Sequence, residues 1–206
     1  MININCIICN ENNFNLFSTF DLDIGKYTLV KCINCDFVYL NPRIEEKNIS
    51  NFYDINYQPF QKKVSFLNII YKCLRKINFI FKYRIINRYN KNKDKILDIG
   101  SGDNFFSKSM NLKGWKSFNY DKYNISNSNI QDLSTLKSNS FNIVTLWHSI
   151  EHMYDINYVF KNINKLLTKD GYLYIACPNL NASEIYYLKN NWIAFDIPRH
   201  LYHFDF

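Results

Sequence analysis

Glycine, proline and long hydrophobic runs are scarce in this sequence. Only five glycines and four prolines occur among 206 residues. No uninterrupted apolar stretch approaches the roughly 20 residues that span a bilayer, and no basic start followed by an apolar run marks a secretion signal. With metal-type cysteine pairs and no such signal, we expect a reducing, cytoplasmic environment. A chain of this length can bury one substantial core and a small satellite.

Two of the five glycines lie in one segment, residues 96–105, which reads ILDIGSGDNF. A short apolar run ends in Asp98, a glycine-rich turn follows, and a helix is predicted over residues 105–112. The turn consists of Gly100, Ser101 and Gly102. A parallel strand that enters a helix in this way places backbone N–H groups and a positive helix end around a ligand. Glycine lets the backbone approach that ligand closely.

An acidic residue follows at a distance that narrows the ligand class. Gly114 precedes a second predicted strand, residues 116–120, which ends at Asp121, 21 positions after Gly100. An acid about 20 residues beyond a glycine turn, at the end of the second strand, is placed to accept the hydroxyls of a ribose. A further acid, Asp132, follows a short predicted strand near Ile130 and is a candidate contact for the adenine amino group.

This arrangement resembles the class I S-adenosylmethionine (SAM) methyltransferases. In that family the acid in the place of Asp98 helps to hold the methionine part of SAM, and Gly100, Ser101, Gly102 and Asp121 would complete the site. Asn104 stands where the family usually has a third glycine. Asparagine tolerates left-handed backbone better than other non-glycine residues, so we expect the turn to form.

The resemblance continues along the chain. Residues 141–152 resemble the family's fourth strand and the loop that follows it. Residues 155–167 have the apolar spacing of a helix. A turn is predicted at 168–171, and residues 172–177 are predicted to form strand five. Residues 192–204 resemble the W…D-x-P-R-H-L-x-H-F signature of one subgroup. The resemblance implies an α/β, Rossmann-like, doubly wound sheet with strand order 3-2-1-4-5, helices on both faces, and a core lacking its last strands.

The four histidines lie only in the two motif segments. We favour His200 as the general base and then His148, although each can instead be a structural histidine. Trp147 would lie beside the cofactor or serve in packing, and Tyr53 and Tyr57 are candidates to cover the methionine end.

Some methyltransferases of this fold bind a divalent metal after strand four. Here the corresponding set would be His148, Glu151 and His152.

The N-terminus contains two C-x-x-C pairs separated by 22 residues, which predict a tetrahedral Zn²⁺ site. Its ligands would be Cys6, Cys9, Cys32 and Cys35. Asn10 and Asp36 follow the pairs where glycine is usual, and both tolerate positive φ. The alternative is four buried or disulfide-bonded cysteines. The sequence downstream also resembles the zinc-ribbon leader of the same subgroup.

Basic charge is concentrated between residues 61 and 95, where eleven Lys or Arg residues and one acid give +10, against −3 for the rest. Apolar residues at 66, 67, 70, 74, 77, 81 and 85 form a helical stripe. We expect a helix that packs this stripe on the core, over the SAM site. An anionic membrane surface and a nucleic-acid contact are the alternatives. The predicted domains are 1–43 (zinc ribbon), 44–92 (basic helical cap) and 93–206 (SAM-binding core, truncated).

Two function classes therefore compete. One is a SAM-dependent methyltransferase that acts on a small molecule or a sugar or glycan precursor, the acceptor class that the subgroup resemblance implies. The other is a degenerate, non-catalytic module that binds a partner through its ribbon and basic helix. A nucleic-acid methyltransferase is a third interpretation, and it predicts strongly salt-dependent RNA binding.

Overall fold

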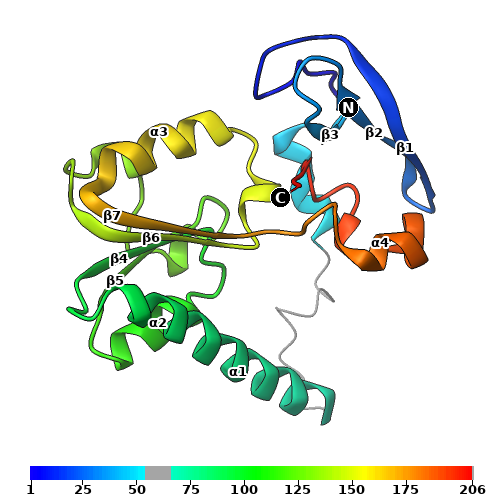
Figure 1. The fold of residues 1–206 in the computed structure, drawn as a ribbon. Coiled ribbons are helices and arrows are strands. Elements are labelled where there is room, and N and C mark those ends of the chain that lie inside the picture. Colours follow the sequence, from blue (N-terminus) through cyan, green and yellow to red (C-terminus); the bar gives the residue numbers. More distant parts are fainter. Residues whose placement is uncertain (54–65, 206) are drawn as a thin grey trace. The chain divides into compact units, whose positions relative to one another are not determined.

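The computed structural model describes residues 1–53 and 66–205, which belong to two compact units (Figure 1). The first unit combines residues 1–53, 148–159 and 176–205, and the second combines residues 66–147 and 160–175. Each unit therefore contains stretches of chain that are far apart in the sequence.

The second unit is built on a sheet with strand order β5-β4-β6-β7. The strands are β4 (Lys95–Ile99), β5 (Lys116–Tyr120), β6 (Phe141–Trp147) and β7 (Leu167–Ala176). β4 pairs in parallel with both β5 and β6. Four of the five β4 residues are buried, as expected for a central parallel strand covered on both faces. The predicted α/β fold with a Rossmann-like parallel sheet is confirmed.

The connection after β4 is the predicted helix, α2 (Phe105–Leu112). Its buried residues Phe106 and Met110 are one turn apart and face the core. They pack in a cluster with Ile96 of β4 and Ile143 of β6. The carboxyl end of β4 therefore enters a helix that is anchored on the sheet, and this anchoring fixes the intervening glycine turn. Later in the chain, α3 (Ile156–Leu166) precedes β7.

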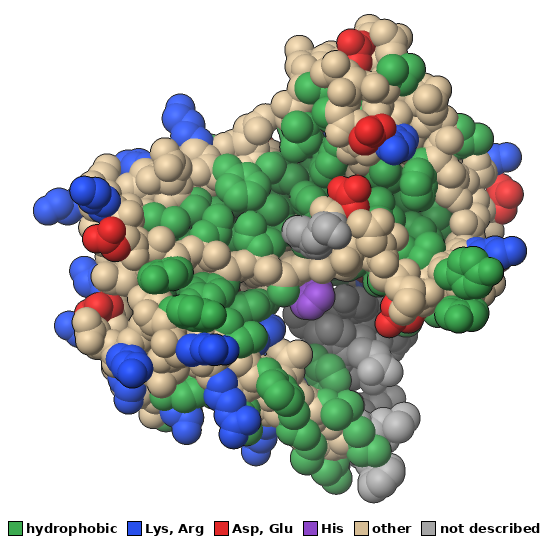
Figure 2. Space-filling view, viewed as in Figure 1, with side chains coloured by type: hydrophobic (Ala, Val, Ile, Leu, Met, Phe, Trp, Pro, Cys, Tyr) green, Lys and Arg blue, Asp and Glu red, His purple; other side chains and the backbone are tan. Residues whose placement is uncertain are grey.

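The long basic helix α1 (Phe66–Tyr89) packs through a different face from the one predicted. Its buried core residues are Phe79 and Ile86, neither of which belongs to the predicted stripe. The stripe residues Ile70, Leu74 and Ile77 are 39–59% exposed. Figure 2 shows basic side chains beside exposed hydrophobic ones over α1. Neither α1 nor any other helix within the described residues has the length and hydropathy needed to traverse a bilayer.

The predicted strand near Ile130 is absent, so the described sheet lacks the third strand of the expected order. The Ile130 amide does donate to Asn119 O of β5 at 3.2 Å, which is one strand-like contact. A short 3₁₀ turn, η4 (Leu133–Thr135), follows directly. The reason is local: the Asp132 side chain accepts from Ser134 N at 2.8 Å and starts the turn instead of extending a ladder.

The predicted turn at residues 168–171 lies inside β7, which begins at Leu167. A Cβ added at Gly171 would lie 3.0 Å from the Thr168 carbonyl oxygen. Residues three apart in an extended strand are separated by about 10 Å, so the chain bends sharply here. Glycine is needed for this close approach rather than for a positive φ.

The first unit has a four-stranded sheet with order β1-β2-β3-β8. Its strands are β1 (Phe14–Leu22), β2 (Gly25–Cys32), β3 (Val38–Leu40) and β8 (Tyr202–His203). β8 comes from the tail motif and pairs antiparallel with β3, with Val38 opposite His203. Arg43 strengthens this pairing because its Nη1 donates to the Tyr202 hydroxyl at 2.9 Å. The N-terminal sheet is thus completed by the C-terminal motif.

Candidate functional site

The glycine turn after β4 adopts the left-handed backbone that its sequence predicts. Gly100 and Gly102 have φ values of 74° and 56°, and Asn104 has φ 57°. The expectation that asparagine can replace the third glycine is therefore confirmed. The Asn104 side-chain amide also donates to Asn127 O at 2.9 Å, which ties the turn to the loop after β5.

Asp98 is a buried carboxyl group in the wall of the pocket beside this turn. Thr145 Oγ1 of β6 donates to Asp98 Oδ1 at 2.7 Å. Burial raises the pKa of Asp98 to about 7, although the Thr145 hydrogen bond and the nearby Lys82 ammonium favour the ionised form. The carboxyl group is thus poised to lose its proton when a cation arrives.

A pocket beside the glycine turn lies entirely within the second unit. Its walls come from α1, the end of β4, the start of α2 and the end of β6: Arg75, Asn78, Phe79, Lys82, Asp98, Gly100, Ser101, Phe105, Phe106 and Trp147. Trp147 lies under the Lys82 ammonium, 4.6 Å from the ring centroid. The buried Trp147 indole N–H has no hydrogen-bond partner among the described residues. An uncommitted donor in the pocket wall fits a ligand that brings its own acceptor.

Sequence reasoning missed that α1 contributes basic side chains to this pocket. Arg75 binds Asp103 with both terminal nitrogens, and its guanidinium stacks 4.1 Å from the Phe105 ring centroid. Burial lowers the pKa of Lys82. Arg75, Phe79 and Lys82 are three or four positions apart, which places them on one helical face. This spacing in the sequence could have indicated that the three residues share one face of α1. The apolar stripe on another face is more pronounced and favoured the wrong face.

Asp121 and Asp132 are both used by the local backbone. Asp121 Oδ2 accepts from Gly102 N at 2.8 Å, and Oδ1 accepts from Tyr123 N at 2.9 Å and from Asn124 N. Each carboxylate oxygen can accept two bonds, so Oδ2 still has capacity for a ribose hydroxyl. Asp132 binds Ser134 instead and does not line the pocket.

The four N-terminal cysteines of the first unit converge as the ribbon spacing predicts. One sulfur from each lies within 4.8 Å of the others, with Cys6 Sγ 3.5 Å from Cys35 Sγ and Cys9 Sγ 3.5 Å from Cys32 Sγ. Four sulfurs bound tetrahedrally to Zn²⁺ are about 3.8 Å apart, given a Zn–S bond of about 2.3 Å. All four are free thiols, so the disulfide alternative is wrong. The donor set fits Zn²⁺.

The turns of the cysteine pairs also have the expected backbone. Asn10 and Asp36 have φ values of 61° and 62°. Their amides donate to Cys6 O and Cys32 O, at 2.8 and 3.1 Å, which closes each knuckle. The two residues therefore replace glycine at the positions where the sequence predicts that they can.

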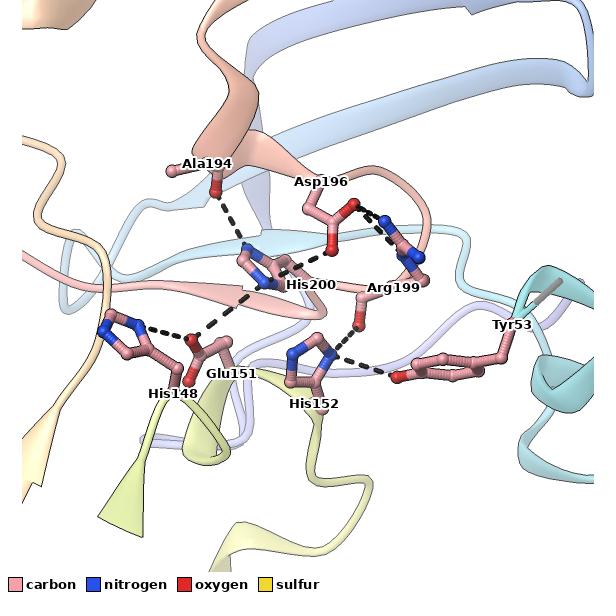
Figure 3. Close-up of polar contacts among 8 residues, drawn as sticks. All are labelled: Tyr53, His148, Glu151, His152, Ala194, Asp196, Arg199 and His200. Atoms are coloured by element: carbon pink, nitrogen blue, oxygen red, sulfur yellow. Dashed lines mark hydrogen bonds and ion pairs between the residues drawn. The ribbon is translucent and has the colours of Figure 1, made fainter. Parts of the chain in front are cut away.

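The histidines of the two motifs meet in the first unit (Figure 3). His148 is 61% exposed at its side chain, and its Nδ1 lies 3.6 Å from Glu151 Oε1. His200 is buried, with Nδ1 2.8 Å from Ala194 O and Nε2 4.0 Å from Glu151 Oε1. The Tyr53 hydroxyl lies 3.2 Å from His152 Nδ1. Tyr57 lies outside the described residues.

Burial sets the protonation of this cluster. It lowers the pKa of His152 to about 4 and also lowers the pKa of His200. For Glu151, burial favours the neutral acid, but His148 and the other neighbouring groups outweigh it and lower the pKa. The imidazoles of His152 and His200 are therefore neutral beside an ionised, buried carboxylate.

Comparison with protein families agrees with the turn and the sheet. The family described as "Methyltransferase domain" matches residues 64–205, so the chain belongs to this family of methyltransferases. Comparison with curated proteins gives no significant match. Among solved structures, the chain is similar to the PH0226 protein from Pyrococcus horikoshii OT3. The two are 20% identical, with a TM-score of 0.44, over 74% of this chain and 70% of that chain.

Proposed function

We propose that this chain is a SAM-dependent methyltransferase whose cofactor occupies the pocket beside the glycine turn. The observation that carries the proposal is the buried Asp98 carboxyl at the end of β4, facing the same pocket as Gly100 and Trp147. Family membership supports methyl transfer as the reaction class. SAM supplies a sulfonium-activated methyl group, so the protein's own task is alignment and exclusion of water.

Each residue around the pocket would contact a different part of the cofactor. Asp98 would hold the ammonium end of the cofactor, because a buried carboxylate gains most from a nearby cation. Gly100, Ser101 and Gly102 would carry the backbone that approaches it, and Asp121 Oδ2 would accept from the ribose. The Trp147 indole N–H would donate to an acceptor atom of the bound ligand. Asp132 would support the loop rather than contact the adenine, because its side chain accepts from Ser134 N.

For the acceptor we propose a small molecule or a sugar or glycan precursor, on the strength of the tail-motif resemblance. An acceptor that loses a proton on methylation needs a base. We assign this role to His148 ahead of His200, because the His148 side chain is 61% exposed and that of His200 is 9% exposed. His148 also follows Trp147 directly in the chain. The four N-terminal cysteines would hold a structural Zn²⁺.

Calorimetric titration of SAM into the zinc-loaded full chain tests the proposal. We expect micromolar binding that strengthens about tenfold between pH 6 and pH 8, because the ionised fraction of a carboxyl with pKa about 7 rises about tenfold over this range. Asp98→Asn should abolish both the binding and its pH dependence while keeping the Thr145 hydrogen bond. Asp132→Asn, at an exposed position of similar chemistry, is the matched control and should bind as the parent does.

Asp121→Ala is a poorer probe, because it also removes the acceptors of three backbone amides. If the folded protein binds no SAM at either pH, the cofactor proposal is wrong, and the non-catalytic interaction module becomes the better interpretation. Binding that persists unchanged in Asp98→Asn would refute the assignment of the pocket.

A further inference from the structure

Glu151 is a buried carboxylate that has no hydrogen-bonded partner within the described part of the chain. Its side chain is 0% exposed, and neither carboxylate oxygen has a hydrogen-bond partner among the described residues. It lies in η5 (Ile150–His152), directly after the loop that follows β6. An isolated ionised carboxylate is very unfavourable in such an environment unless a cation or several donors compensate it.

Two neighbouring imidazoles are fixed in the tautomer that exposes Nε2 as an acceptor. His200 Nδ1 lies 2.8 Å from the carbonyl oxygen of Ala194, and His152 Nδ1 lies 3.1 Å from that of Arg199. A carbonyl oxygen only accepts, so each Nδ1 must carry the proton and each neutral ring keeps its lone pair on Nε2. Metal-binding histidines are oriented by backbone carbonyls in this way.

The Nε2 atom of His200 is directed toward two carboxylate oxygens, as Figure 3 shows. His200 Nε2 is 4.0 Å from Glu151 Oε1 and 3.5 Å from Asp196 Oδ2. One potential ligand atom from each of Glu151, His152 and His200 lies within 4.8 Å of the other two. With neutral rings, acceptors face acceptors, and a cation between them makes the arrangement favourable.

We propose that Glu151, His152 and His200 bind a divalent first-row transition metal ion. Two imidazoles and carboxylate oxygens suit Zn²⁺, Co²⁺ or Fe²⁺ better than Mg²⁺, which prefers oxygen ligands and water. Ligand atoms about 2.1 Å from one ion lie about 3.4 Å apart in tetrahedral geometry. The cluster therefore contracts by about an ångström when the ion binds.

The proposed ion differs from the cysteine-bound Zn²⁺ in ligands and in role. It joins the segment after β6 to the tail segment that carries Asp196 and His200, both within the first unit. Two of its ligands, Glu151 and His200, are buried, which favours a structural ion. The ligand set also differs from the set expected from sequence, because His200 takes the place of His148. The inference does not depend on SAM binding or on methyl transfer.

Co²⁺ titration of protein whose cysteine site already holds one equivalent of Zn²⁺ tests the proposal. We expect one further equivalent to bind and to give visible d–d absorption without a thiolate charge-transfer band. Glu151→Gln and His200→Gln should each weaken this uptake at least tenfold while the cysteine site keeps its Zn²⁺. His148→Gln is the matched control: it changes an exposed histidine beside the same carboxylate and should leave Co²⁺ uptake unchanged.

Cadmium-113 NMR of the wild-type protein keeps the test independent of how the variants fold. Two resonances, one in the all-sulfur range and one in the nitrogen–oxygen range, are expected. A single all-sulfur resonance with no second Co²⁺ equivalent would overturn the proposal and leave a proton- or water-bridged network. Loss of Co²⁺ uptake in His148→Gln would overturn the ligand set.

Discussion

The buried carboxyl of Asp98 makes stability depend on pH in a direction opposite to that of most acidic residues. Its pKa is 3.8 without the protein environment and about 7 in the folded chain, because burial disfavours the charge. Between these values the folded state holds a proton that the unfolded state has released. Stability therefore falls as pH rises through this window and levels off above pH 7.

The magnitude follows from the shift. Three pKa units correspond to about 4 kcal/mol of lost stability above pH 7, at about 1.36 kcal/mol per unit. At pH 5 the loss is only about 1.6 kcal/mol on the same basis. Asp98→Asn removes the titrating group and keeps an acceptor for Thr145 Oγ1. The difference in unfolding free energy between the variant and the parent should therefore grow by about 3 kcal/mol, in favour of the variant, from pH 5 to pH 8.

Urea denaturation of both full-length proteins at pH 5, 6, 7 and 8, with constant zinc, measures this difference. Other titrating groups cancel because they are common to both chains. Asp132→Asn, an exposed acid, should show no such growth. Thr145→Val should shift the pH range over which stability falls to higher pH, because the hydrogen bond that favours the ionised form of Asp98 is lost. A difference between Asp98→Asn and the parent that stays constant over pH would refute the reasoning.

Three further predictions concern the packing, the turn and the cysteine site. Urea denaturation should show that Ile86→Ala destabilises the fold by about 3 kcal/mol. The same change at the exposed neighbour, Ile85→Ala, should cost less than about 0.5 kcal/mol. Equal effects would contradict the assignment of the buried face of α1. Asn104→Ala should lower the unfolding free energy by about 1–2 kcal/mol, since it loses a hydrogen bond and strains a positive φ, whereas Asn104→Gly should be closer to neutral. Cys9→Ser should lose bound zinc by metal analysis and melt at a lower temperature, whereas Cys73→Ser, at an exposed thiol, should retain both properties.

Local sequence signals predicted most elements of the second unit because each signal has a local physical cause. Residues 105–112 and 116–120 form the expected helix and strand with the same boundaries. The glycine turn and Asn104 could be predicted because positive φ restricts the residue type. The expected strand near Ile130 failed because Asp132 offers the backbone a competing turn.

Two features could not be predicted because they depend on tertiary packing. The apolar stripe of α1 correctly predicts a helix but not which face of the helix is buried. Phe79 and Ile86 are buried because they pack against side chains of the sheet, and the helix's own sequence does not determine this. The grouping of His200 with Glu151 depends on a chain path that brings the tail beside the segment after β6. Single-sequence patterns contain no signal for such a pairing. The domain boundaries and the roles of individual site residues remain predictions.

The pairing of β8 with β3 has a consequence for the order in which the chain folds. Val38 and His203 are partners although they lie 165 positions apart. The ribosome releases β1, β2 and β3 early, but their sheet stays open at one edge until β8 has been synthesised. Contacts with such a long sequence separation form slowly. The exposed edge of β3 is therefore a point where a nascent chain can pair with the wrong strand. A metal ion bound by the four cysteines needs only the first 35 residues. It would hold the early strands in register until β8 arrives.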